Sequence, residues 1–155
     1  MTDVQLWLKK LKEYGFTEKD FNSSKKELTK QFGKEAPDSD VIWGLFNKAI
    51  LKNINNYFEL SGIYSDMASF LELENRSKAD ILGFQQEAHK AKLFHYKRLG
   101  KDKVRCVATL GSQHLCKECE KLNGKIFTIE ESLKNMPIPN KCKNKLCRCC
   151  YVNID

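Results

Sequence analysis

Cysteine placement is the feature of this sequence that most constrains its fold. Six of the seven cysteines lie between Cys116 and Cys150, and the first hundred residues contain none. A disulfide framework usually spreads its bridges across the fold and requires an oxidising compartment. A dense group with an odd total instead indicates metal binding, with buried reduced thiols as the alternative. We therefore predict that the C-terminal third folds around a cysteine-bound metal ion.

The spacing of these cysteines is typical of a zinc site. One pair is Cys116-x2-Cys119, and the second group is Cys142-x4-Cys147-x-Cys149-Cys150. Structural zinc takes four soft ligands in a tetrahedron, and a C-x2-C segment presents two thiolates from one tight turn. The predicted cofactor is one structural Zn²⁺, held by Cys116, Cys119, Cys142 and Cys147.

The fourth ligand is the least determined member of this set. Cys142 is preferred because its spacing lets it share one loop with Cys147. Cys149 and His114 are the alternatives. Cys106 falls within a predicted strand and is expected in the core, whereas His89 and His95 are expected at the surface or half-buried on a long helix.

Basic residues surround the predicted ligands, and residues 101–155 hold 11 Lys and Arg against 6 Asp and Glu. Such cations favour thiolates. They also bias association toward nucleic acid or an acidic protein face, with a solvated surface as the alternative. The candidate nucleic-acid contacts are Lys117, Lys143, Lys145 and Arg148.

Composition is that of a globular chain. The 155 residues are 41% apolar and 30% charged, enough for one domain, or one domain with a small metal-stapled module. No apolar run approaches the roughly 18 residues of a membrane span. Charges interrupt the apolar N-terminal stretch, so we expect no signal peptide and a cytosolic chain with reduced thiols.

Hydrophobic periodicity predicts an α+β fold, with a helical N-terminal body followed by a small three-stranded antiparallel, zinc-stapled module. The predicted regions are 1–75, helical, and 76–155, which contains a long helix and the cysteine module at 101–155. We expect helices around 4–15, 41–58, 64–73, 77–100 and 128–135, and strands at 104–110, 125–127 and 149–154. An exposed aromatic set on the helix at 41–58, with Trp43, Phe46 and Tyr57, is the candidate docking surface.

Catalytic motifs are missing from this sequence. It has no Gly-rich phosphate loop, no H-E-x-x-H and no nucleophile elbow. A closed four-cysteine site lacks the open position of a catalytic zinc. Redox work by Cys116-x2-Cys119 would require the motif to open a helix in a βαβ unit, whereas here a β-turn context is expected. We predict no enzyme, with a metal-dependent nuclease as the alternative, although the His and Asn pair of such sites is lacking.

The cysteine region resembles a known family. The order T-x-G-S-x-x-x-C-x2-C-x-x-L-x-G-K-x-F, then a Pro-rich loop and C-R-C before an apolar strand, is similar to the Mu F-like family of phage minor head proteins. The resemblance covers about residues 76–155. Ser112 stands where the family has Asp, and no His precedes Cys147, so Cys142 would replace that histidine as ligand. The residues that carry the resemblance are Thr109, Cys116, Cys119, Leu122, Gly124, Lys125, Phe127, Pro137, Pro139, Cys147, Arg148 and Cys149.

This resemblance implies a structural role in capsid morphogenesis, in the bacterial host cytoplasm and the virion. Its implied partners are a phage portal or capsid protein and DNA bound non-specifically through phosphates. Neither a membrane nor a small-molecule substrate is expected. The alternative function is a small zinc-binding accessory or regulatory protein that binds nucleic acid.

Overall fold

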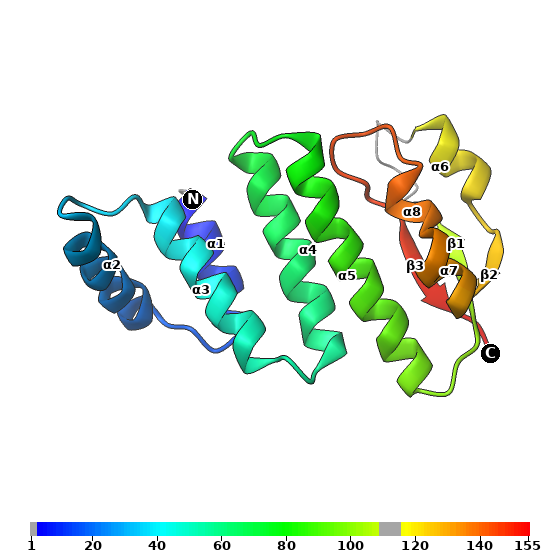
Figure 1. The fold of residues 1–155 in the computed structure, drawn as a ribbon, viewed down its shortest axis with the longest axis horizontal. Coiled ribbons are helices and arrows are strands. Elements are labelled where there is room, and N and C mark those ends of the chain that lie inside the picture. The colour runs from blue at the N-terminus through cyan, green and yellow to red at the C-terminus, as the bar shows by residue number, and fades with distance from the viewer. Residues whose placement is uncertain (1–2, 109–115) are drawn as a thin grey trace. The chain divides into compact units, whose positions relative to one another are not determined.

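The computed structural model describes residues 3–108 and 116–155 (Figure 1). Helices precede a small three-stranded antiparallel sheet, so the predicted α+β class is confirmed. The chain divides into two compact units, Met1–Ile54 and Asn55–Asp155. The predicted helical region ended at residue 75, whereas this division assigns residues 55–75 to the C-terminal unit. No helix in the described ranges has the length and apolar character of a membrane span.

The first unit consists of three helices, α1 (Asp3–Glu13), α2 (Glu18–Phe32) and α3 (Asp38–Lys52). A capping box between Thr17 and Asp20 starts α2, and Gly33 ends it in the left-handed conformation. Both α1 and α2 pack on α3. Trp7 meets Phe46 edge-on, with ring centroids 5.9 Å apart, and both rings are buried.

The helix predicted over 41–58 is two helices, because α3 ends at Lys52 and α4 (Tyr57–Leu73) begins a new one. The Asn53 side chain donates to the Ala49 carbonyl, and the Asn56 side chain accepts from the Glu59 backbone N–H. These local bonds satisfy the free helix ends. The gap between the predicted helices at 41–58 and 64–73 is also wrong, since α4 runs through residues 59–63.

The end of α3 at Lys52 divides the residues of the predicted docking surface between two helices. Phe46 is fully buried, so its predicted exposure is wrong. Trp43 and Tyr57 are half-buried and belong to different helices. Tyr57 stacks on Phe94 with ring centroids 5.3 Å apart, under the Arg98 guanidinium. The three residues therefore do not form one exposed aromatic face.

The second unit starts with a helical hairpin, in which α4 packs along α5 (Lys78–Arg98) (Figure 1). Ser77 caps α5 by accepting from the Asp80 N–H. The sheet that follows has the order β2-β1-β3, and β1 pairs antiparallel with both neighbours. The remaining elements are β1 (Lys103–Val107), α6 (Lys117–Leu122), β2 (Ile126–Thr128), α7 (Ile129–Asn135), α8 (Pro137–Asn140) and β3 (Cys150–Asn153).

The sheet and one face of α5 enclose a core that also contains the cysteines. Val104 and Cys106 alternate inward along β1, while Lys103 and Arg105 are exposed. The core position predicted for Cys106 is confirmed, and burial raises the pKa of its thiol to about 11. The predicted strand continued to residue 110, but β1 ends at Val107, and residues 109–110 lie outside the described ranges.

Candidate metal centre

The C-x2-C pair lies at the start of a helix. Cys116 is the N-cap residue of α6, and the backbone N–H of Cys119 donates to its sulfur at 3.3 Å. The β-turn context predicted for this pair is therefore wrong. The cap places both sulfurs on the same side of one helical turn, with Cys119 buried and Cys116 half-buried.

Cys142 approaches this pair from the end of α8. Its sulfur lies 3.8 Å from that of Cys116. Four thiolates around zinc, each about 2.3 Å from the metal in a tetrahedron, would be separated by about 3.8 Å. The sulfurs of Cys116, Cys119 and Cys142 all lie within 4.8 Å of one another. This trio thus has the spacing of three corners of a tetrathiolate site.

A second trio overlaps the first. The sulfurs of Cys119, Cys147 and Cys149 also lie within 4.8 Å of one another. Strand β3 begins only at Cys150, so Cys147 and Cys149 belong to the segment before it, and both sulfurs reach the cluster. Cys119 is common to both trios. Five cysteines therefore converge, including all four predicted ligands and the alternate, Cys149.

The other candidate ligands lie elsewhere. Cys106 and Cys150 belong to neither trio. His114 lies outside the described residues. His89 is buried against Tyr151, with ring centroids 5.3 Å apart, so its predicted surface or half-buried position is wrong. His95 is half-buried, as predicted.

Burial determines how the free thiols titrate. Desolvation raises the pKa of Cys119 and Cys147, and neighbouring thiols add to the effect. Burial also opposes ionisation of Cys116, but hydrogen bonds from the backbone of Lys143 and Cys119 outweigh it and lower its pKa to about 7. Several buried thiolates cannot coexist without a compensating cation. A bound metal supplies that charge and displaces the protons.

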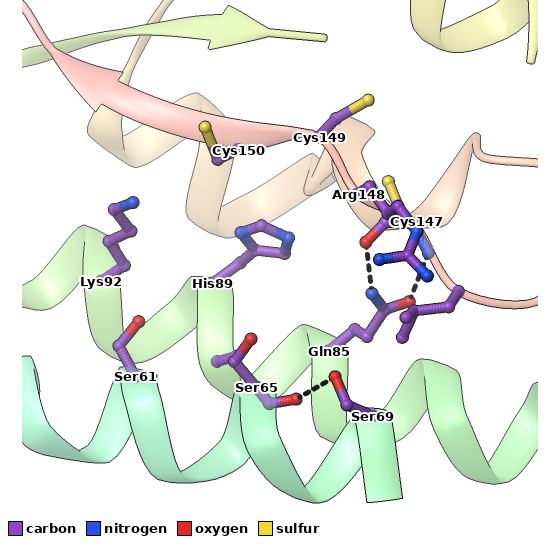
Figure 2. Close-up of a pocket in the computed structure, with 12 residues that line it drawn as sticks. Ser61, Ser65, Ser69, Gln85, His89, Lys92, Cys147, Arg148, Cys149 and Cys150 are labelled. Carbon is purple, nitrogen blue, oxygen red and sulfur yellow. Dashed lines mark hydrogen bonds between the residues drawn. The ribbon is translucent and has the colours of Figure 1, made fainter. Parts of the chain in front are cut away.

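Helix α5 holds the ligand-bearing segments through their backbone. Gln85 is buried; its amide nitrogen donates to the Cys147 carbonyl at 2.6 Å, and its amide oxygen accepts from the Cys147 N–H at 3.0 Å (Figure 2). Lys78 donates to the Cys142 carbonyl at 2.9 Å. Sequence reasoning missed Gln85. The available signal was a polar residue four positions after Ile81 on an apolar helix face.

The four predicted nucleic-acid contacts fall into two groups. Lys117 and Lys143 are exposed next to the cysteine cluster. Lys145 donates to the Asn75 side chain at 3.0 Å, and Arg148 lies 3.7 Å from the Glu72 carboxylate. The second pair is therefore already engaged within the chain.

Comparison with known proteins adds no identification. No protein-family model, curated protein or solved structure matches the chain. The resemblance to the Mu F-like family stays a prediction. The fold is unlike that of a thioredoxin-type enzyme: the C-x2-C pair opens a helix, but each described strand pairs antiparallel, and three more thiols converge on the pair. What the geometry supports directly is a cysteine cluster compatible with metal binding.

Proposed function

We propose that this chain binds one structural zinc ion and that the metal staples the module at residues 101–155. The observation that carries the proposal is the convergence of five sulfurs in two trios that share Cys119. An all-thiolate donor set suits zinc among the common cellular metals. The proposed ligands are Cys116, Cys119, Cys142 and Cys147.

Cys147 is the better fourth ligand because it interacts with two members of the first trio. Its sulfur lies within 4.8 Å of that of Cys119, and its thiol also interacts with that of Cys142. Its backbone is held at both N–H and C=O by Gln85. Cys149 then packs beside the site as an alternate ligand.

The test is the metal content of the purified protein, measured by elemental mass spectrometry. We expect one zinc per chain. Cys147→Ser should lower the zinc content or affinity more than Cys149→Ser, and Cys150→Ser should leave it unchanged. A metal-free native protein whose cysteines react freely with a thiol reagent would overturn the proposal.

We further propose a biological role as a phage or prophage minor head protein that acts in capsid morphogenesis and docks on a portal or capsid protein. Support comes from the residue order around Cys116 and Cys147 and from a closed thiolate site, which suits a structural role. The chain would act in the bacterial host cytoplasm and enter the virion. Co-expression with portal and capsid proteins of the same genome tests this role: a complex of defined stoichiometry is expected, and no binding to either would contradict it.

A nucleic-acid-binding accessory protein is the second candidate. One observation favours it: Lys121, which ion-pairs with Glu118, lowers the pKa of that carboxyl, and the nearby Lys143 and Lys141 lower it further. Several cations thus gather beside α6. DNA affinity that falls steeply with salt, and falls further in Lys143→Gln, without binding to portal or capsid protein, would favour this function.

A further inference from the structure

A pocket lies beside the cysteine cluster, within the second unit. It has a volume of about 380 Å³ and opens between α4, α5 and the segment that leads into β3 (Figure 2). One wall carries serine hydroxyls at every fourth residue of α4. Helix α5 and the segment before β3 supply the rest of the lining. Polar side chains in the lining include those of Ser61, Ser65, Ser69, His89, Lys92 and Arg148.

The charged groups of this pocket are both cationic. Lys92 comes from α5 and Arg148 from the segment before β3, on either side of His89 (Figure 2). Among the residues that the structure describes, no carboxylate lines the pocket. The Glu72 carboxylate, 3.7 Å from Arg148, is not part of the lining. The Lys92 ammonium lies 6.0 Å from the centre of the Tyr96 ring. Because Arg148 is paired with Glu72, the net positive charge of the lining rests on Lys92.

His89 contributes a largely buried imidazole ring to the pocket. Its side chain is 9% exposed, and no residue in the described ranges hydrogen-bonds to its ring. Buried imidazoles ordinarily have such a partner. Desolvation and the nearby Lys92 lower the pKa of His89 to about 4, so the neutral ring carries one N–H donor. A ligand that accepts a hydrogen bond would satisfy it.

Two hydroxyls on the opposite wall are also available. Within the described ranges, Ser61 and Ser65 have no partner for their side-chain oxygens, whereas Ser69 donates to the Ser65 carbonyl at 3.2 Å. The sulfurs of Cys147 and Cys149 point away from the pocket in Figure 2. Negative charge in the pocket would therefore face the cations and hydroxyls rather than the thiolates.

We propose that this pocket binds an oxyanion of the phosphate class. Donors come from three sides: the hydroxyls of α4, Lys92 with His89 on α5, and the Arg148 guanidinium, which the ligand would share with Glu72. A tetrahedral oxyanion presents acceptors in all these directions, whereas a carboxylate presents two in one plane. Arginine pairs with phosphate through charge-assisted bonds. The phosphate group can come from a small phosphomonoester or from a nucleic-acid backbone.

The test is calorimetric titration of the full-length protein, with the metal it retains on purification, against inorganic phosphate. We expect one phosphate per chain. Lys92→Met should weaken binding about tenfold or more, because it removes a charge-assisted contact. Arg148→Gln should weaken it similarly. Lys90→Met is the matched control: Lys90 is exposed on the same helix and lies outside the pocket lining, so this variant should bind like the wild type.

NMR provides a second readout, since phosphate should shift the His89 ring resonances of the wild type, and in Lys92→Met the same shift should require about tenfold more phosphate or higher. Equal losses in Lys90→Met and Lys92→Met, or no phosphate binding at all, would overturn the proposal. Nucleoside monophosphate and single-stranded DNA then distinguish the sources: tighter binding of one, abolished by Lys92→Met, identifies it. Metal content, measured on the same samples, reports on the zinc proposal separately.

Discussion

The two compact units differ in what holds them together. The first unit contains no cysteine, and its helices of 11 to 15 residues bury aromatic and aliphatic side chains. The cysteine module of the second unit is built from helices of four to seven residues and strands of three to five. Helices this short are marginal by themselves in water. Its core contains five buried cysteines, which are Cys106, Cys119, Cys142, Cys147 and Cys149.

This difference indicates two sources of stability. Apolar burial stabilises the first unit, since its core residues are nearly all aliphatic or aromatic. The module instead places several thiols in its core, and these can ionise there only when a cation compensates the charge. Metal removal and core truncation should therefore act on different parts of the chain.

Loss of the metal should have the largest effect. Zinc binding supplies on the order of 10 kcal/mol in small modules, so chelation or Cys119→Ser should unfold β1–β3 and α6–α8. Cys119 is the most damaging position because both trios contain it. Hydrogen exchange resolved along the chain is the measurement, and α1–α3 should keep their protection. Cys150→Ser is the control. Full protection of the module after chelation would contradict the separation.

Truncation of a core side chain in the first unit should destabilise that unit and leave the metal site intact. Phe46→Ala removes a fully buried ring and should cost about 3–5 kcal/mol. Phe32→Ala, at a position 46% exposed, should cost far less. Denaturant unfolding followed by Trp7 and Trp43 fluorescence measures both, and zinc content should not change in either variant. Metal loss in Phe46→Ala would mean that the two units fold as one.

Gln85 tests whether the helical hairpin prearranges the metal ligands. Gln85→Leu leaves the N–H and C=O of Cys147 without partners, at about 1–3 kcal/mol for each buried group. Groups that orient ligands typically contribute about 10–100-fold to metal affinity. Competition with a chelator of known affinity is the measurement. Gln86→Leu, which removes only an exposed bond to Asn140, is the matched control. Equal zinc affinity in the two variants would show that Gln85 has no positioning role.

Local signals in the sequence predicted much of this structure, and long-range contacts account for what they missed. The helix start at residue 128 and the spacing of the cysteines were readable because they depend on a few neighbouring positions. The break at Asn53–Asn56 was missed because apolar periodicity continues across it. Gln85 could not be assigned a partner, since Cys147 lies 62 positions away.

The smallest predicted effect concerns a capping box in each of the two units. Thr17 and Thr128 each form a complete capping box, with Asp20 and Glu131 respectively. Thr17→Ala and Thr128→Ala should each cost about 1 kcal/mol in the metal-bound protein. After chelation only Thr17→Ala should still have a measurable cost, because α7 would already be unfolded. Chemical denaturation of both variants, with and without chelator, measures this. An undiminished cost of Thr128→Ala without metal would mean that α7 folds independently of the cysteine cluster, and the module would then rely on apolar packing as the first unit does.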